Sequence, residues 1–194
     1  MDDWANSMNV KIEQVTIADE AKLLEWRNSL EVSKWMFSNH VISEAEHSAW
    51  FKQMLLSEKT VYWKIIKDSQ AVGTVNLSKI DLTNASCSWA IYLGEASARG
   101  FGAAQAASLL SLNFAFDVLR LGVVRCEAIA ENVRAIGLYK QVGFVSLPTQ
   151  AEVVRRGESN LAIVKLELSD DAWKLSKNAL QQILNEKGVS LDEQ

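Results

Sequence analysis

The chain has 194 residues, of which 48% are hydrophobic and 23% charged, a composition typical of one globular domain with a sizeable core. A formal net charge of −4 and a pI near 5.3 leave no chain-wide basic field, so neither nucleic acid nor an anionic membrane is expected as a partner. No stretch has the pattern of a signal peptide or a membrane span. Cys87 and Cys126 lie in apolar runs without metal-ligand spacing, so we expect a cytoplasmic protein with reduced cysteines and no metal.

The N-terminal third predicts one strand followed by two helices. Residues 9–15 alternate apolar and polar side chains, which indicates a half-buried strand. Residues 16–30 and 43–55 each begin with a hydroxyl residue that is followed three positions later by an acidic one, the spacing of a helix capping box. Apolar residues then recur at helical intervals in both segments.

The middle of the chain predicts strands and then a long helix. Residues 61–67 and 71–80 flank a polar turn and read as a strand pair, and residues 87–93 read as a third strand. From Ala103 onward the sequence is helical, with a predicted buried stripe at Ala103, Ala107, Leu110, Phe114 and Val118.

The last third predicts a buried strand, a short helix and closing elements. Residues 122–130 are nearly continuously apolar, as in a strand that is covered on both faces. The helix after Asn132 should stop at Gly143, a residue suited to the left-handed position beyond a helix end. Two closing strands and an amphipathic helix follow, at residues 144–148, 161–168 and 170–188.

This order of elements predicts an α/β fold, a mixed sheet with helices on both faces. We expect a main domain at residues 1–169 and an appended helix and tail at residues 170–194. The amphipathic helix is suited to packing on this domain or on a partner, which leaves a homodimer open.

A glycine turn between the strand at 87–93 and the helix at Ala103 indicates a phosphate site. Free N–H groups and the helix dipole favour an anion there, and glycine lets the anion approach the backbone. A dinucleotide fingerprint starting at Gly100 fails because its sixth position is Gln105, and a Walker A ending is absent. The pattern Arg99-x-x-Gly102-x-Ala104 instead resembles the pyrophosphate loop of the GNAT N-acetyltransferases.

A second segment, "ENVRAIGLYKQVGF" at residues 131–144, resembles the other signature of this family: a strand, an asparagine, a short helix with a tyrosine, and Gly-Phe. The resemblance covers Val10 to Leu168. It implies a GNAT fold, in which the sheet is splayed between the strands at 87–93 and 123–130 and acetyl-CoA lies in the gap. The cofactor-binding residues implied are Ile91, Tyr92, Leu93, Arg99, Gly100, Phe101, Gly102, Ala103, Ala104, Asn132 and Tyr139.

The same resemblance implies roles in acetyl transfer. A backbone N–H near Leu93 would polarise the thioester carbonyl, and Tyr139 would be the general acid for the leaving thiol. From the residues alone, Tyr139 also fits an apolar helix stripe, and Asn132 also fits a helix N-cap. Glu127 is a candidate base or substrate ligand because a carboxylate in an apolar strand is costly, unless it faces solvent at an edge. His47 and water remain the other candidates for the base.

The acceptor region resembles the N-acetyltransferases of pseudaminic acid biosynthesis (PseH-type), which acetylate the 4-amino group of a UDP-linked sugar. The resemblance rests on Arg27-Asn28, the run Trp35 to Ser38, Ile42-Ser43, and the spacing of His47 and Trp50. It departs from the pattern at Trp50, where phenylalanine is usual, and near Ser88, where an aromatic is common. The substrate-binding residues implied are Arg27, Met36, Phe37, His47, Trp50 and Glu127.

Two other functions fit the sequence. A GNAT of the ribosomal-protein type would acetylate a peptide α-amine with the same cofactor loop, and the acidic charge of the chain suits a basic peptide. A non-catalytic acetyl-CoA-binding module would keep the loop without turnover. On composition alone the aromatic residues at 35–37 and Trp50 belong in a core, His47 is a satisfied buried histidine, and Arg27 pairs with Glu31.

Overall fold

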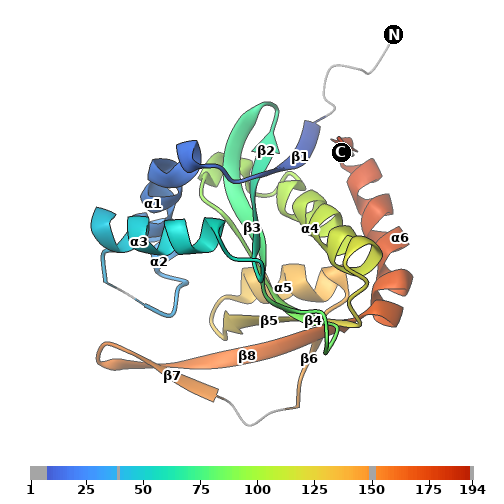
Figure 1. The fold of residues 1–194 in the computed structure, drawn as a ribbon. Helices are drawn as coiled ribbons and strands as arrows, with labels where there is room; N and C mark the ends of the chain where they lie inside the picture. The colour runs from blue at the N-terminus through green and yellow to red at the C-terminus, as the bar shows by residue number, and fades with distance from the viewer. Residues whose placement is uncertain (1–7, 39, 149–151, 193–194) are drawn as a thin grey trace.

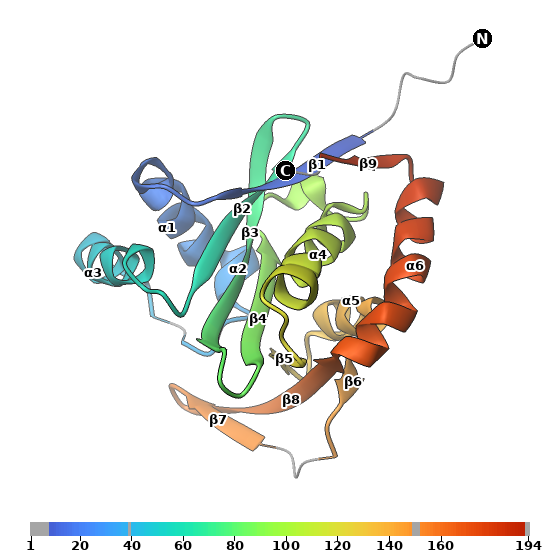
Figure 2. The same cartoon turned by 45° about the vertical axis from the view of Figure 1, so that its right-hand side comes forward.

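The computed structural model describes residues 8–38, 40–148 and 152–192. Within these residues the strands form one mixed sheet of nine strands in the order β6-β8-β5-β4-β3-β2-β1-β9, and β7 pairs with β8 (Figures 1 and 2). The strands are β1 (Met8–Gln14), β2 (Val61–Lys67), β3 (Gln70–Asp81), β4 (Ser86–Leu93), β5 (Val123–Ile129), β6 (Val145–Ser146), β7 (Glu152–Arg156), β8 (Ser159–Ser169) and β9 (Val189–Leu191).

Helices cover both faces of this sheet. They are α1 (Glu20–Asn28), α2 (Leu30–Ser33), α3 (Glu44–Leu55), α4 (Ala103–Asn113), α5 (Val133–Val142) and α6 (Asp170–Glu186), with 3₁₀ turns η2 (Ile17–Asp19) and η3 (Ala96–Ala98) and a π turn η4 (Phe114–Val118). Figure 2 shows α1 and α3 on one side of the sheet and α4 and α6 on the other. The mixed α/β fold with helices on both faces is as the sequence predicted. None of the described helices combines the length and the apolar character that a membrane span requires.

Each face of the sheet has its own hydrophobic core, because successive strand side chains point to opposite faces. On β2, Trp63 and Ile65 join the large core beneath α4, whereas Tyr62 packs into a smaller core with Trp26 and Phe51 from α1 and α3. The sequence pattern of β2 therefore fixes which helices it contacts.

The sheet opens between β4 and β5. These parallel strands pair only where Ser86, Cys87 and Ser88 face residues 123–125, although β4 continues to Leu93 and β5 to Ile129. The remaining edge of β4 on this side has no strand partner among the described residues. The splay predicted from the family resemblance is confirmed.

Two predicted helices differ from the structure. The helix expected at 16–30 stops at Asn28 because Ser29 adopts extended dihedrals (φ −61°, ψ 144°), and the chain restarts as α2. The buried stripe expected to continue through Val118 is also wrong. The π turn after α4 rotates the side chains, so Val118 is exposed and Phe116 is buried instead.

The C-terminal segment packs on the domain. Helix α6 contacts α4 and α5, and β9, which the sequence did not predict, extends the sheet by pairing in parallel with β1. This segment also supports the glycine turn, because a Cβ added to Gly102 would lie 2.9 Å from Val189 and 3.4 Å from Lys187. The Lys187 ammonium donates a hydrogen bond to the Gly100 carbonyl.

Candidate active site

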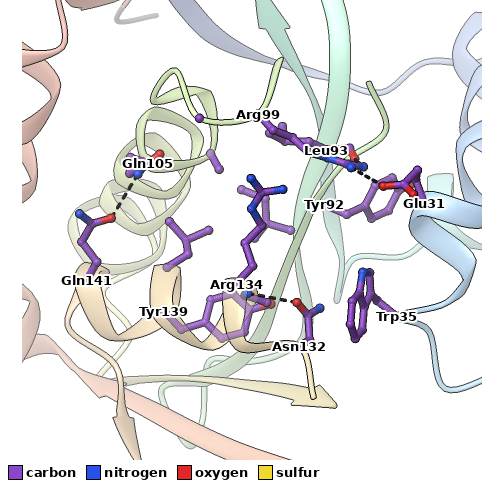
Figure 3. A pocket seen from close by; sticks show the side chains of 15 residues that line it. Glu31, Trp35, Tyr92, Leu93, Arg99, Gln105, Asn132, Arg134, Tyr139 and Gln141 are labelled. Atoms are coloured by element: carbon purple, nitrogen blue, oxygen red, sulfur yellow. Dashed lines mark hydrogen bonds and ion pairs between the residues drawn. The ribbon is translucent and has the colours of Figure 1, made fainter. Parts of the chain in front are cut away.

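Two cavities meet at the point where β4 and β5 separate. The first, which we call the loop cavity, has a volume of about 360 Å³ and lies beside the glycine turn (Figure 3). Its lining residues are Glu31, Trp35, Ile91, Tyr92, Leu93, Arg99, Gly100, Ala104, Gln105, Asn132, Arg134, Ala135, Leu138, Tyr139 and Gln141.

The second cavity, which we call the aromatic cavity, has a volume of about 450 Å³ and lies beneath α1 and α3. Its lining residues are Leu23, Arg27, Met36, Phe37, Ile42, Glu46, His47, Trp50, Tyr62, Asn76, Ala90, Ile91, Tyr92, Glu127 and Tyr139. Ile91, Tyr92 and Tyr139 line both cavities, so a ligand in one meets a ligand in the other at these residues.

The glycine turn presents only part of the predicted loop to the loop cavity. Gly102 has φ +97°, a left-handed conformation that glycine adopts at low cost, and α4 begins directly after it. Arg99, Gly100 and Ala104 line the cavity. Phe101 does not: its ring is 59% exposed and lies beneath the Lys67 ammonium. Gly102 and Ala103 are buried beneath the turn, so any contribution they make to a ligand comes from their backbone.

Arg99 is tied to two other elements. Its guanidinium forms an ion pair with Glu31 of α2 and donates a hydrogen bond to the Leu93 carbonyl at 3.3 Å. Lys34 and Arg99 together lower the pKa of the Glu31 carboxyl to about 2, so this carboxylate is charged at neutral pH. The expected ion pair between Glu31 and Arg27 is not formed. The helix is interrupted at Ser29, so these two residues are not one turn apart on a continuous helix.

Helix α5 positions two of the predicted residues. Asn132 is its N-cap, since the side-chain carbonyl accepts a hydrogen bond from the Ala135 N–H at 3.2 Å, and the residue also lines the loop cavity. Tyr139 is 5% exposed and packs edge-on against Trp89, with ring centroids 5.4 Å apart. Burial raises the pKa of Tyr139 above its ordinary value of 10, so the phenol remains protonated at neutral pH.

Arg27 is the cation of the aromatic cavity. One guanidinium nitrogen donates a hydrogen bond to the Ser38 hydroxyl at 2.7 Å, and the other is buried without a hydrogen-bond partner among the described residues. Desolvation lowers the pKa of Arg27, although not enough to discharge a guanidinium. Asn28 holds the same loop by exchanging two 2.9 Å hydrogen bonds with the Ile42 backbone.

The walls of this cavity are aromatic. His47 is 3% exposed, stacks on Phe51 and lies 5.2 Å from the Trp50 ring centroid, while its Nδ1 has no partner within the described parts of the chain. Burial lowers the pKa of His47 below 6.5, so its imidazole is neutral at neutral pH. Phe37 and Trp50 are partly exposed at the cavity and are not core residues as composition alone suggested.

Glu127 lies on β5 beyond its last pairing with β4 and lines the aromatic cavity opposite α1 and α3. Its side chain is 48% exposed, and the Lys165 ammonium lies 3.9 Å away. The two sequence interpretations of Glu127 therefore both describe it: it is exposed to solvent and it faces the site. Across the described residues, no group of three or more histidine, cysteine or acidic side chains is arranged to hold a metal.

Sequence reasoning missed several lining residues. Arg134 and Gln141 lie within the second signature and are seven positions apart, so they share one face of α5, but each is two positions from a predicted residue, a spacing that does not place it on the same face. In the sequence, Gln105 was significant only as a mismatch to another motif.

Arg156 lines neither cavity, and no sequence pattern indicated its contacts. It belongs to β7, which was not predicted, and it donates hydrogen bonds to the Lys34 and Met36 carbonyls.

Comparison with known proteins identifies this arrangement. A family model described as an acetyltransferase (GNAT) domain matches residues 9–145, and the chain belongs to this family. It is an acetyl-CoA-dependent N-acetyltransferase. The residues present fit acetyl-CoA, because the loop cavity combines the unpaired β4 edge with the N-terminus of α4 and the cations Arg99 and Arg134.

Two curated relatives and many solved structures are similar to this chain. The acetyltransferase PseH of Campylobacter jejuni is 25% identical over 128 residues, which is 66% of this chain and 78% of that protein. A spermidine N-acetyltransferase from Vibrio cholerae, solved with CoA and spermine, has a TM-score of 0.78 and 16% identity, covering 85% of this chain and 98% of its own. A GCN5-related N-acetyltransferase from Brucella melitensis has a TM-score of 0.74 and 20% identity, covering 89% and 81%. At these identities the solved structures establish the fold.

Proposed function

We propose that the enzyme transfers the acetyl group of acetyl-CoA to the 4-amino group of a nucleotide-linked sugar, UDP-4-amino-4,6-dideoxy-N-acetyl-β-L-altrosamine, in pseudaminic acid biosynthesis. The observation that carries the proposal is the half-buried Arg27 in the aromatic cavity, with a guanidinium nitrogen that lacks a partner among the described residues. The similarity to PseH supports the same acceptor.

The charge of Arg27 favours an anionic acceptor over a polyamine. A desolvated guanidinium is costly unless it meets an acceptor oxygen, and the diphosphate of a nucleotide sugar supplies pairs of oxygens that the planar guanidinium can bind in a bidentate manner. A polyamine would instead bring two or more ammonium groups toward a fixed cation. The carboxylates of Glu46 and Glu127, which also line the cavity, are the groups that would attract a polyamine. Glu46 already has a partner, because the His40 imidazole lies 2.9 Å from its carboxylate.

The remaining walls suit a deoxy sugar and a base. Met36, Phe37 and Trp50 offer apolar and aromatic surface to a methyl group and a uracil ring. His47, being neutral, would hydrogen-bond a sugar or nucleotide oxygen through its free Nδ1 rather than attract a phosphate by charge.

Acetyl-CoA supplies a thioester, whose acyl carbon the amine attacks. The backbone of the glycine turn, from Arg99 to Ala104, would hold its pyrophosphate, and Ile91, Tyr92 and Leu93 would hold its pantetheine arm, with Asn132 beside it. A backbone N–H near Leu93 would polarise the carbonyl.

Two side chains would move protons. Sugar amines beside electron-withdrawing oxygens resemble α-amines, which are neutral in roughly one molecule in seven at pH 7, so a weak base suffices. Glu127 would take the amine proton, directly or through water. Tyr139, held protonated by burial at the junction of the cavities, would donate its proton to the leaving sulfur. The leaving thiolate of CoA would be desolvated at the same place. Desolvation raises the pKa of the thiol as well, which narrows the difference between the pKa values of the thiol and of Tyr139.

The test measures acetyl-CoA-dependent thiol release with three acceptors in parallel: the UDP-linked 4-amino-4,6-dideoxy sugar, spermidine, and a basic peptide with a free α-amine. We expect turnover with the sugar alone. Arg27→Met should lower kcat/KM for the sugar by about 10- to 100-fold, the loss of one charge-assisted hydrogen-bonding group, while KM for acetyl-CoA stays within twofold.

Turnover with spermidine or the peptide alone would overturn the proposed acceptor and leave the acetyltransferase assignment intact. Turnover with the peptide alone would indicate an enzyme of the ribosomal-protein type. An Arg27→Met variant that keeps full activity toward the sugar would also contradict the proposal, because the guanidinium would then have no part in binding.

A further inference from the structure

The loop cavity contains two arginines, and they differ in what they already contact. Arg99, which belongs to the recognised loop, is committed to the Glu31 carboxylate and the Leu93 carbonyl. Since Lys34 and Arg99 lower the pKa of Glu31 to about 2, that carboxylate is charged throughout the physiological pH range and offsets part of the charge of Arg99, although it is shared with Lys34.

Arg134 has no such partner. Arg134 lies in the first turn of α5 and is exposed. Within the described residues, no ion pair or side-chain hydrogen bond involves its guanidinium. Figure 3 shows its side chain rising from α5 into the middle of the loop cavity, toward the glycine turn and away from Glu31. Gly100, Ala104 and Gln105 line the same cavity from the opposite side.

We propose that Arg134, rather than Arg99, is the side chain whose charge binds the diphosphate of acetyl-CoA. A free guanidinium in a concave site beside a helix N-terminus offers several donors and an uncompensated charge to phosphate oxygens. Arg99 has a positioning role, because its contacts join the glycine turn to α2 and to the end of β4.

The test is the affinity for CoA, measured by isothermal titration calorimetry on the full chain. Arg134→Met should raise Kd by about 10-fold or more, the equivalent of one charged hydrogen-bonding group. Arg99→Met should raise it less than about threefold, and Arg134→Lys should restore part of the loss. Because the diphosphate is the target, the loss on Arg134→Met should be equal for CoA and for dephospho-CoA, which lacks the 3′-phosphate.

The matched control is Lys140→Met. Lys140 is an exposed cation on the same helix that does not line the loop cavity, so its loss changes net charge without removing a ligand. An equal loss of affinity in this control would overturn the proposal, as would an unchanged Kd in Arg134→Met. A loss seen with CoA but not with dephospho-CoA would also overturn it, because the contact would then be to the 3′-phosphate.

Discussion

Tyr139 lies where the loop and aromatic cavities meet, and its ring packs against the stacked rings of Trp89 and Phe144. Tyr139→Phe keeps this packing and removes only the hydroxyl. We expect kcat to fall about 100-fold, within the range for loss of a general acid, while Kd for CoA stays within twofold. Steady-state kinetics and calorimetry on the same preparation check both values.

The pH profile offers a second check on the same residue. Because burial raises the pKa of Tyr139, the proton donor is present up to at least pH 10. The rate should therefore rise with pH as the acceptor amine loses its proton, with no alkaline decline below pH 10 from the tyrosine. A decline near pH 8 in the wild type that disappears in Tyr139→Phe would contradict the raised pKa, because Tyr139 would then lose its proton in that range.

Residues that line the two cavities were predictable where a motif or a resemblance named them. Every predicted acceptor residue lines the aromatic cavity, whereas of the predicted loop residues only Arg99, Gly100 and Ala104 line the loop cavity. The missed residues depend on tertiary context. The partner of Arg99 could not be anticipated, because the extended backbone at Ser29 removes Glu31 from the α1 register and brings it to the glycine turn.

At the scale of elements, the glycine turn depends on both its backbone conformation and the segment behind it. Gly102→Ala places a Cβ at φ +97° and 2.9 Å from Val189, which should cost about 1–3 kcal/mol of stability and raise KM for acetyl-CoA several-fold. Gly137→Ala is the matched control. That glycine lies within α5 with no heavy atom close to the added Cβ, so the change should stabilise by about 0.5–1 kcal/mol.

Thermal denaturation distinguishes the two substitutions by the opposite sign of their effects. A Gly102→Ala variant as stable and as active as the wild type would mean that the turn relaxes freely and that the C-terminal segment does not support it.

Element type was predictable from periodicity, whereas element ends were predictable only where a residue type marks them. Helix α5 stops at Gly143 as expected, with φ +111° at that residue. The helix ending at Asn28 was predicted to run two residues further, because nothing in the residue types of Ser29 and Leu30 signals an extended backbone. Strands β7 and β9 were missed because their stability comes from pairing with β8 and β1, not from an alternating pattern of their own.

At the scale of the whole molecule, the β7–β8 hairpin holds the loop at residues 34–38, which we call the acceptor loop because Met36 and Phe37 line the aromatic cavity, although the hairpin lies more than one hundred residues further along the chain. The Arg156 guanidinium donates to the Lys34 carbonyl at 2.7 Å and to the Met36 carbonyl at 3.1 Å. Arg156→Met should free this loop and raise KM for the acceptor about tenfold, with a smaller change in kcat.

The neighbouring Arg155 provides the control, because it donates within its own hairpin to the Gly157 carbonyl. Arg155→Met should leave the KM for the acceptor unchanged. Equal effects of the two substitutions would show that the charge of the hairpin, and not its contact with the loop, governs acceptor binding.

The C-terminal support of the glycine turn bears on how the enzyme matures during synthesis. Lys187 lies 87 positions after Gly100 in the chain, and β9 begins shortly after Lys187, at Val189. Translation releases the N-terminal parts of a chain first, so both signature motifs leave the ribosome well before the residues on which Gly102 rests. We therefore expect cofactor affinity to appear late in synthesis, because a chain that ends after β8 would carry both signature motifs but lack α6 and β9, which pack against the core and against Gly102.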